Sequence, residues 1–427
     1  MKSLIEWLAY IEGQHPKSID MGLERVREVA SRMQLPRPAR HVITVAGTNG
    51  KGSTVAFLES IARAAGWSVG AYTSPHLLAY NERVRIEGRD ASDEELVAAF
   101  EVVEAARFSP FSQGQDSSLT YFEYGTLAAL WSFAQHDLDL TILEVGLGGR
   151  LDATNIVDHD VAVITTVDLD HQDYLGNDRE AIGFEKAGIA RAWKPLVLGE
   201  DDPPASVLRH AYAIGASAVR AGCDYFFEPI DADTWRWHEV GFELELPMPR
   251  LAAPAQMRNA AAAIAALRAL DAPVTEAAWR EGIATAHLPA RLQRFVRDDV
   301  EIVVDVGHNP QAARELSQWL RAAPIVGRTL AVFAALSDKD LEGVVAAVSG
   351  QIDVWYLAGL SEAGPRGMRA DAFAERLRVT KAGNDAVFDT VVQALAAARA
   401  QAAAGGRIVV FGSFFTAAAA LRALNES

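Results

Sequence analysis

Two series of short, continuously apolar segments alternate with helical patterns along this chain, and this alternation limits the folds that it can adopt. The first series lies at 42–45, 69–74, 140–147, 161–167 and 195–199, and the second at 301–306, 329–336, 352–359 and 407–413. Strands that are apolar throughout are buried on both faces, and helices between them are the usual cover of a parallel sheet. We therefore predict an α/β fold with mostly parallel sheets.

The two series predict two domains. The chain has 427 residues, which is more than one ordinary domain. We expect an N-terminal domain over 1–290, built on a P-loop-type, mostly parallel sheet with helices on both faces. A smaller, Rossmann-like α/β domain is expected over 296–427, with 291–295 as the linker. A cleft between two such domains is a usual place for a ligand.

Two stretches interrupt this rhythm. Residues 234–246 (TWRWHEVGFELEL) alternate between apolar and polar side chains, which predicts a β-hairpin. The polar stretch 108–118 predicts a mobile loop that precedes a helix starting near Thr120.

The net charge and the cysteine content exclude several classes of protein. The formal net charge of −16 argues against nucleic acid or an anionic membrane as the main partner. Cys223 is the only cysteine, so no disulfide can form within the chain, and a reducing compartment fits. The N-terminal MKSLIEWLAYIEG has the pattern of neither a signal peptide nor a membrane span. We expect a cytoplasmic protein.

The stretch HVITVAGTNGKGST, His41–Thr54, has the pattern of a phosphate-binding loop between a strand and a helix. Its spacing is shorter than the usual one, because only Thr48 and Asn49 separate Gly47 from Gly50. A glycine loop that leads into a helix directs unpaired backbone N–H groups at one point, where an anion binds. A turn that only joins strand and helix is the alternative. The lysine and the two hydroxyl residues that open the helix favour a phosphate.

Polar side chains follow several predicted strands at their carboxyl ends, where open α/β sheets bind ligands. These residues are Ser74, Glu144, His171, Asp305 and His308. Glu144 closes an apolar run, and a buried carboxylate needs a cation or hydrogen-bond donors. Ser74 precedes a proline and could be a turn residue, and His171 fits a solvated acidic loop equally well. Convergence on the edge that carries the phosphate loop favours a shared site.

Short motifs extend this pattern over the whole chain: VAGTNGKGST, TSPHL, LTYFEYGT, EVGLGGRLDATN, DHQDYLG, EKAGI, LPARLQ, DVGHNP and GSFFT. They occur in the order seen in folylpolyglutamate synthases. The chain therefore resembles the family of bacterial dihydrofolate synthase/folylpolyglutamate synthases, which belongs to the Mur ligase superfamily. The resemblance runs from about Leu4 to the last helix.

The resemblance implies an ATP-dependent acid–amino-acid ligase of folate biosynthesis. Such an enzyme adds L-glutamate to dihydropteroate, giving dihydrofolate, and to tetrahydrofolate species, giving polyglutamates. Its N-terminal domain would bind ATP and pteroate, and its C-terminal domain would be the glutamate-ligase domain. The implied partners are the small molecules ATP, L-glutamate, dihydropteroate and reduced folates, and a monomer is the habit of the family. Mg²⁺ is the expected cofactor, and K⁺ is a second candidate ion.

The resemblance also assigns site residues. The ATP set is Thr48, Asn49, Gly50, Lys51, Gly52, Ser53, Asn259, Arg291, Asp305 and His308. The pteroate set is Ile19, Asp20, Met21, Thr120, Tyr121, Phe122, Glu123, Leu151, Asp152 and Ala153. The metal set is Ser74, Glu144 and His171, and the catalytic set is Lys51, His171 and Lys186.

Two of these assignments have an alternative. The resemblance makes Lys186 a carbamylated lysine, whereas an ordinary surface lysine of a helix would pair with Glu185 or Glu180. Histidine is an unusual ligand for Mg²⁺, so His171 could instead favour Mn²⁺ or act from outside the coordination shell. The chain also departs from the family at Phe415 and Ser337, where histidine is common.

The expected chemistry activates a carboxylate with ATP. Transfer of the γ-phosphoryl group onto the carboxylate gives an acyl phosphate, which the amine of glutamate attacks. Lys51 and Mg²⁺ would stabilise charge on the transferring group, and closure of the second domain would exclude water. The base that deprotonates the amine stays unassigned.

Three other functions compete with this interpretation. A single-activity folylpolyglutamate synthase would share all of these motifs. A cell-wall Mur ligase would carry a UDP-binding domain before the phosphate loop, and only 46 residues precede Gly47 here. A nucleotide-dependent switch could use the same loop, but a guanine-specific switch would be expected to carry Asn-Lys-X-Asp, which this sequence lacks.

Overall fold

The computed structural model of the chain describes residues 2–17, 19–108, 117–383 and 385–425. The chain divides into two compact units. Unit 1 comprises 1–250 and 257–286, and unit 2 comprises 251–256 and 287–427. Residues 109–116 of the loop predicted at 108–118 lie outside the described residues.

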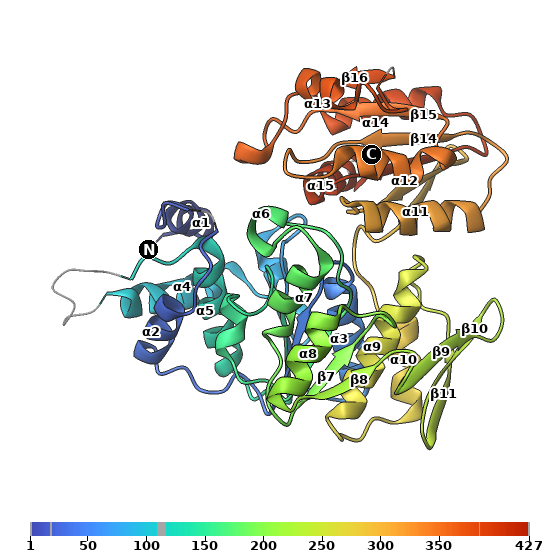
Figure 1. Cartoon of the computed structure of the whole chain (residues 1–427). Coiled ribbons are helices and arrows are strands. Elements are labelled where there is room, and N and C mark those ends of the chain that lie inside the picture. Colours follow the sequence, from blue (N-terminus) through green and yellow to red (C-terminus); the bar gives the residue numbers. More distant parts are fainter. Residues whose placement is uncertain (1, 18, 109–116, 384, 426–427) are drawn as a thin grey trace. The chain divides into compact units, whose positions relative to one another are not determined.

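An eight-stranded sheet forms the centre of unit 1 (Figure 1). Its strands, in spatial order, are β4 (Arg89–Asp90), β3 (Val84–Ile86), β2 (Val69–Tyr72), β5 (Leu140–Glu144), β1 (His41–Ala46), β6 (Val161–Ile164), β7 (Pro195–Leu198) and β8 (Ser217–Arg220). All neighbours from β2 to β8 pair in parallel, and β3 pairs antiparallel with both of its neighbours, β2 and β4. The prediction of a mostly parallel sheet is confirmed.

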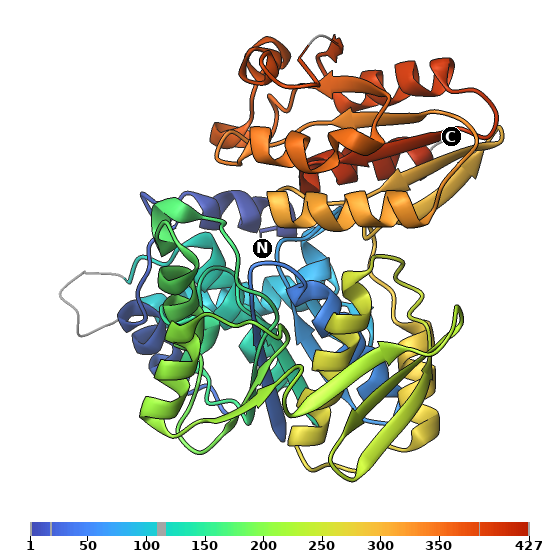
Figure 2. The same cartoon turned by 45° about the vertical axis from the view of Figure 1, so that its right-hand side comes forward.

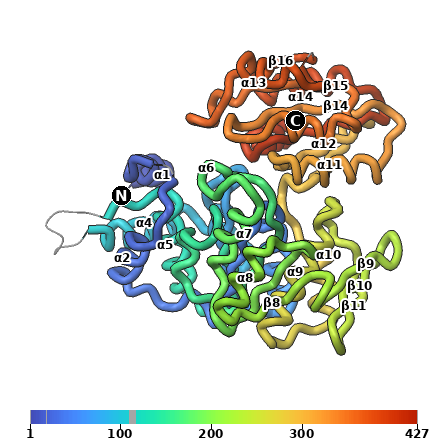
Figure 3. The backbone as a smooth tube through the Cα atoms, in the orientation of Figure 1, coloured from blue at the N-terminus to red at the C-terminus, as the bar shows by residue number. Residues whose placement is uncertain are grey.

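Helices and short 3-10 turns surround this sheet. They are α1 (Leu4–Glu12), α2 (Glu24–Arg32), α3 (Lys51–Ala64), η1 (Tyr80–Arg83), α4 (Asp93–Arg107), α5 (Tyr121–Ala134), η2 (Ala153–Ile156), α6 (Gln172–Leu175), α7 (Arg179–Ala187), α8 (Ala205–Ile214), α9 (Ala255–Ala269) and α10 (Glu276–Thr285). The backbone tube shows α1 and α2 beside α4 and α5 (Figure 3). Among the helices of the described residues, none is long and apolar enough to cross a membrane.

Helix α5 begins where the sequence predicts. The side chain of Thr120 accepts a hydrogen bond from the backbone N–H of Glu123, and the carboxylate of Glu123 accepts one from the N–H of Thr120 at 2.8 Å. This reciprocal capping box satisfies two of the N–H groups that a helix start leaves unpaired.

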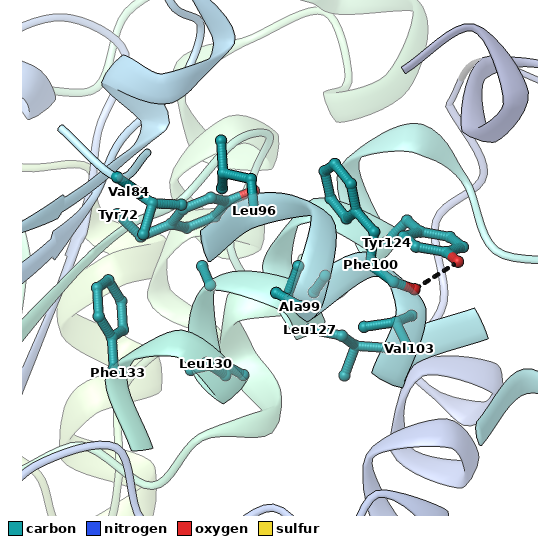
Figure 4. Close-up of a cluster of buried hydrophobic side chains, with 14 of the residues drawn as sticks. Tyr72, Val84, Leu96, Ala99, Phe100, Val103, Tyr124, Leu127, Leu130 and Phe133 are labelled. Carbon is teal, nitrogen blue, oxygen red and sulfur yellow. Dashed lines mark hydrogen bonds between the residues drawn. The ribbon is translucent and has the colours of Figure 1, made fainter. Parts of the chain in front are cut away.

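A cluster of buried apolar side chains joins α4 and α5 to the edge of the sheet (Figure 4). Phe100 and Val103 of α4 pack with Tyr124 and Leu127 of α5, and Tyr72 contributes from β2. The hydroxyl of Tyr124 donates to the backbone oxygen of Phe100 at 3.1 Å, so the polar atom of a fully buried ring has a partner. The packing fixes α5 and the residues at its N-terminus.

The hairpin predicted at 234–246 is confirmed. Strand β10 (Thr234–Glu239) pairs antiparallel with β11 (Phe242–Pro247) and with β9 (Tyr225–Pro229), which gives a separate three-stranded sheet. This sheet lies against α9 and α10 (Figures 1 and 2). The side chains of Trp235 and Trp237 are fully buried, and the indole N–H of Trp237 donates to the backbone oxygen of Ala261 in α9.

Unit 2 is a second α/β unit. Its strands, in spatial order, are β12 (Gln293–Arg297), β13 (Val300–Val304), β17 (Arg407–Phe411), β14 (Thr329–Phe333), β15 (Val354–Ala358) and β16 (Ala386–Phe388). Its helical elements are α11 (Pro310–Ala322), α12 (Leu341–Val348), η3 (Ser349–Gln351), η4 (Gly364–Arg366), α13 (Ala370–Leu377), α14 (Val391–Gln401) and α15 (Phe414–Asn425). Phe333, Trp355 and Phe411 form the centre of its core.

The predicted linker 291–295 is wrong in part. Residues 293–297 form strand β12, which pairs antiparallel with β13 at the edge of the second sheet. The strand is half-exposed, so its sequence lacks the continuous apolar run that marks the central strands. The second unit therefore begins before the predicted linker ends, and it also contains the earlier segment 251–256.

The cluster in Figure 4 makes a testable contribution to stability. Phe100 is fully buried, so the substitution Phe100→Ala should lower the free energy of unfolding by about 3–5 kcal/mol through lost contacts and the cavity that remains. Urea unfolding followed by tryptophan fluorescence measures this change. Val240→Ala, at a fully exposed position between β10 and β11, is the control and should change stability by less than about 0.5 kcal/mol. Equal effects of the two substitutions would contradict the assignment of the core.

Candidate active site

The phosphate-binding loop joins β1 to α3 at the carboxyl edge of the first sheet. Gly50 is the N-cap of α3 and has a left-handed backbone conformation, with φ of 88°. No side chain caps this helix end, so its first N–H groups face the loop. This is the strand, glycine loop and helix start that the sequence predicts.

Residues that follow β6 hold the loop in shape. The backbone N–H of Thr48 donates to the backbone oxygen of Thr166 at 2.8 Å. The hydroxyl of Thr48 donates to the backbone oxygen of Asp168 at 3.0 Å. The hydroxyl of Thr165 donates to the backbone oxygen of Asn49 at 2.6 Å. These hydrogen bonds therefore hold the loop against the end of the neighbouring strand β6.

At two positions of the loop, both the close neighbouring atoms and the backbone conformation require glycine. A Cβ atom on Gly47 would lie 1.8 Å from the hydroxyl oxygen of Thr165. One on Gly50 would lie 2.4 Å from Oδ1 of Asn259, a buried residue of α9. Asn259 thus packs directly on the phosphate loop, and its place in the ATP set stays a prediction.

Lys51 places its ammonium group over this loop. Its Nζ atom donates to the backbone oxygens of Gly47 at 2.9 Å and Thr48 at 3.3 Å. The cation therefore lies at the concave side of the loop, where the phosphoryl groups of a bound nucleotide would meet it. Gly52 and Ser53 complete the first turn of α3, and Ser53 is buried.

The strand ends bring the predicted metal residues to the same edge. Strand β5 ends at Glu144, between the ends of β1 and β2, and the backbone N–H of Ser74 donates to Oε2 of Glu144 at 3.2 Å. His171 precedes α6 in a left-handed conformation, on the segment whose Asp168 contacts Thr48.

This donor set fits a hard divalent cation. A carboxylate and a hydroxyl supply oxygen ligands, and a protein that binds a metal–nucleotide complex needs few ligands of its own, because the phosphates supply others. Within the described ranges no three His, Cys, Asp or Glu side chains gather into a metal site, and the predicted set has only two of these types, Glu144 and His171. The nitrogen of His171 is the least suited to Mg²⁺.

The three segments predicted to line the pteroate site lie together. Arg25 of α2 joins two of them, because its guanidinium pairs with the carboxylates of both Asp20 and Glu123. The third segment, 151–153, leads into η2, which contacts both α2 and α5. In the loop before this segment, a Cβ atom on Gly146 would lie 2.6 Å from the ring of Phe122. The neighbouring Gly148 lies near Met21, whose Cε atom would be 3.6 Å from an added Cβ.

Other members of this set belong to the same elements. Thr120 and Tyr121 are the N-cap and the first residue of α5, Ile19 precedes Asp20 on the chain, and Leu151 and Ala153 flank Asp152. Asp152 is buried, which raises the pKa of its carboxyl group. The backbone N–H groups of Leu147 and Thr154 and the hydroxyl of Thr154 donate to it, so it also fixes its own loop.

Lys186 is a buried residue of α7, which contradicts the alternative of a surface lysine. Only 3% of its surface is exposed, and its side-chain amine makes no hydrogen bond or ion pair in the described part of the chain. Glu185 pairs with Arg150 at 2.9 Å, and Glu180 pairs with Arg209. Burial, with a smaller contribution from the charge of Lys51, lowers the pKa of Lys186 to about 7. Its amine is therefore partly neutral near neutral pH.

The remaining predicted ATP residues form a cluster in unit 2. The carboxylate of Asp305, just after β13, accepts the backbone N–H groups of Leu292 at 2.9 Å and Gly307 at 2.6 Å, and burial raises its pKa. The guanidinium of Arg291 lies 5.3 Å from the ring centroid of Phe414, and the ring of His308 lies 6.4 Å from the same ring. This second cluster also follows strand ends, those of β13 and β17.

Comparisons with known proteins agree with this arrangement. Residues 45–267 match the Mur ligase middle domain, and residues 290–414 match the Mur ligase glutamate ligase domain. The dihydrofolate synthase/folylpolyglutamate synthase of Escherichia coli K12 is 48% identical over 423 residues, which cover 99% of this chain and 96% of the relative.

The chain belongs to the dihydrofolate synthase/folylpolyglutamate synthase family of Mur ligases.

Solved structures of this family share the fold over the whole chain. E. coli FolC in complex with DHPP and ADP matches with a TM-score of 0.92 and 46% identity, covering 100% of this chain and 98% of that one. A bifunctional folylpolyglutamate synthase/dihydrofolate synthase with Mn, AMPPNP and L-glutamate bound matches with a TM-score of 0.90 and 45% identity, with the same coverage.

The two departures from the family motifs lie in unit 2. Phe415 is in the first turn of α15 and is 46% exposed. Ser337 is exposed in the segment after β14, where its backbone oxygen accepts a hydrogen bond from Arg376 at 2.6 Å. Neither residue contacts Asp305 through a described hydrogen bond, so the structure gives no reason to connect them with that cluster.

Sequence reasoning missed residues that position the site. Thr165, Thr166 and Asp168 shape the phosphate loop, and the sequence signal for them was the pair of hydroxyls at the end of the apolar run VAVITTV. Arg25 bridges two pteroate segments, but an arginine in a polar helix carries no local signal of such a role.

The contact between Gly50 and Asn259 predicts a selective loss of nucleotide binding. Gly50→Ala would force a side chain into Oδ1 of Asn259 and should abolish ATP binding, measured by isothermal titration calorimetry. Gly66→Ala is a matched control, because Gly66 has φ of 83° but no atom within 4 Å of an added Cβ. Both variants should lose about 1–2 kcal/mol of stability from the left-handed backbone. If both bind ATP as the unmodified protein does, Asn259 is not a wall of the nucleotide site.

Proposed function

We propose that this chain is an ATP-dependent ligase that adds L-glutamate to dihydropteroate and to tetrahydrofolate species. Three contacts within unit 1 support the proposal: Lys51 lies over the phosphate loop, Ser74 contacts Glu144 at the end of β5, and Arg25 joins two of the predicted pteroate segments. Relatives that align along the whole chain are named for both activities. Two of their solved structures hold DHPP with ADP, and AMPPNP with Mn and L-glutamate.

The ligase reaction has two steps. One carboxylate oxygen of the pteroate or folate attacks the γ-phosphorus of ATP, the bond to the bridging oxygen of ADP breaks, and an acyl phosphate forms. The amine of glutamate then attacks the acyl carbon, phosphate leaves, and the nitrogen loses a proton. ATP therefore converts a poor leaving group into a good one.

The chain's own residues orient and stabilise the first step. Lys51 holds positive charge at the concave side of the phosphate loop, where negative charge accumulates on the transferring phosphoryl group. The first N–H groups of α3 bind phosphate oxygens in the same place. Asn259 and the threonines after β6 keep the loop in its binding shape.

Mg²⁺ is the proposed metal, with Ser74 and Glu144 as ligands and His171 as a ligand or an outer neighbour. A relative that was solved with Mn and AMPPNP bound supports this, because a family member binds a divalent cation together with a nucleotide analogue. When bound, the ion neutralises charge on the phosphates. Arg291, Asp305 and His308 are proposed to contact ATP from unit 2, and the matched glutamate ligase domain supports a role for that unit in glutamate addition.

Product analysis distinguishes the proposed two activities from a folylpolyglutamate synthase with one activity. The purified chain is incubated with ATP, glutamate and either dihydropteroate or tetrahydrofolate, and each product is identified by mass spectrometry. We expect dihydrofolate from the first substrate and a longer polyglutamate from the second. Product from tetrahydrofolate alone would reduce the function to that of a folylpolyglutamate synthase, and ATP hydrolysis without either product would overturn the ligase.

The variant Lys51→Ala tests the phosphate loop directly. Loss of the cation should lower the rate of ADP release at least a hundredfold, on the order of the effect of removing one group that stabilises a transition state. Lys381→Ala removes an exposed lysine of unit 2 and is the control. Circular dichroism confirms that both variants are folded. Near-normal turnover by the folded Lys51→Ala variant would show that the loop has only a structural role.

We also propose that Lys186 is carbamylated in the active enzyme. A partly neutral amine can add carbon dioxide, forming an N–C bond and releasing a proton, and the product is an anion with oxygen atoms. The modification would replace a buried cation near Lys51 with an anionic group. Glu200, whose pKa burial raises to about 7, is among the acidic groups that act on this lysine, with Asp152 and Asp170.

The pH dependence of stability tests the state of Lys186. Its pKa of about 7 in the folded chain lies below the ordinary lysine pKa of 10.5, so the unfolded chain holds a proton that the folded chain releases between these values. Without carbon dioxide, unmodified Lys186 should therefore destabilise the protein below pH 7, and this cost should disappear as the pH rises toward 10.5.

The measurement compares melting temperatures of the unmodified chain and Lys186→Met over this pH range, with and without bicarbonate. Without bicarbonate, the unmodified chain should be the less stable at neutral pH. Carbon-13 NMR with labelled bicarbonate should show one carbamate signal that Lys186→Met lacks. A bare amine in bicarbonate, with full ligase activity of Lys186→Met, would contradict the proposal.

A further inference from the structure

Arg83 is a buried cation without a described counter-charge. Only 9% of the residue is exposed, and within the described part of the chain it forms no ion pair with a carboxylate. The other arginines of comparable burial do: Arg107 pairs with Glu104 and Arg407 with Glu301. A buried charge is costly unless an opposite charge or hydrogen bonds compensate it, so Arg83 needs a partner that the folded chain does not supply.

The surroundings of Arg83 leave part of its guanidinium available. Its Nε atom donates to Nδ1 of His76 at 2.9 Å, and its central carbon lies 5.2 Å and 5.5 Å from the ring centroids of Tyr80 and Tyr121. Its two Nη groups donate no hydrogen bond to any described residue. The side chain is thus fixed by one hydrogen bond and two aromatic rings, with its forked end free to donate to an anion.

The position of Arg83 identifies this anion. Its backbone oxygen accepts the N–H of Thr73 at 2.9 Å, next to the predicted metal ligand Ser74. Its guanidinium lies near Tyr121, which belongs to the pteroate segment that starts α5. Arg83 therefore lies between the segment that would receive an aromatic ring system and the edge that would receive the phosphates.

We propose that Arg83 binds the acceptor carboxylate of the pteroate or folate substrate. The inference rests on the proposed ligase function and adds a residue that binds the carboxylate to be phosphorylated. A planar guanidinium matches a carboxylate, and the contact leaves a second carboxylate oxygen to attack the γ-phosphorus of ATP. Because both substrates bring an acceptor carboxylate, Arg83 serves both reactions.

The experiment measures substrate binding and turnover in the full chain. Arg83→Met should raise the KM for dihydropteroate and for tetrahydrofolate by about tenfold to a hundredfold, the range expected for a lost hydrogen bond to a charged group. The dissociation constant of ATP should stay within about twofold, because Lys51 and the loop are unchanged. Arg83→Lys keeps the charge and should recover part of the loss. Arg268→Met, which removes an arginine from the face of Phe242 elsewhere in unit 1, is the matched control.

An analogue without the carboxylate distinguishes carboxylate binding from a structural role. Fluorescence titration compares dihydropteroate with the same pteridine–aniline skeleton that lacks the carboxylate. The unmodified chain should bind dihydropteroate more tightly than the analogue, and Arg83→Met should bind the two alike. This comparison on the unmodified chain and Arg83→Lys remains decisive if Arg83→Met does not fold.

Each other outcome overturns the inference. Equal weakening of dihydropteroate and its analogue would make Arg83 a structural residue of the pteroate segments. A raised KM for tetrahydrofolate alone would assign Arg83 to a carboxylate of the glutamate tail. An unmodified chain that ligates glutamate, with an unchanged KM in Arg83→Met, overturns this inference and leaves the proposed function intact. An unmodified chain that forms neither amide product overturns the proposed function itself.

Discussion

The parallel pairing of β1 with β5 on one side and β6 on the other is the constraint on which the candidate site depends. The register places Val45 opposite Glu144 and Ala46 opposite Ile164, so the three strands end at nearly the same level. The phosphate loop, the buried carboxylate of Glu144 and the segment from Thr165 to His171 therefore leave the sheet side by side. Hydrogen bonds between these segments then fix the loop, and no single segment has this shape alone.

The charge of the site differs from that of the whole molecule. The chain carries a formal net charge of −16, yet Lys51, Lys186 and Arg83 lie close to one edge of unit 1. Among the described residues, neither Lys186 nor Arg83 forms an ion pair with a carboxylate. Burial makes each positive charge more effective, because little solvent screens it. The proposed substrates are all anions, so they would bring negative charge to these cations. The net charge of the whole chain therefore does not decide what this edge binds.

The sequence predicts those parts of the fold that local patterns determine. Central strands such as β1 and β14 are apolar throughout and are recognisable at once, and the capping residues of α5 mark its start. The edge strands β12 and β16 were missed because their exposed faces break the apolar run, and this error produced the wrong linker. The position of the candidate site residues after strand ends was predictable for the same local reason. Arg25 and Arg83 were not, because their roles depend on residues from segments far apart in the chain, such as Glu123 and Tyr121.

The contact of Gly50 with Asn259 has a consequence for the order in which the protein matures. The loop and α3 leave the ribosome early, whereas α9, which carries Asn259, is synthesised much later. Until α9 has docked, one face of the phosphate loop lacks its wall, and the space beside Gly50 stays open to solvent. A nascent chain that ends at residue 250 already contains the whole glycine motif and the strands that support it. Such a chain still lacks Asn259, so this wall of the phosphate loop forms only after α9 has been synthesised.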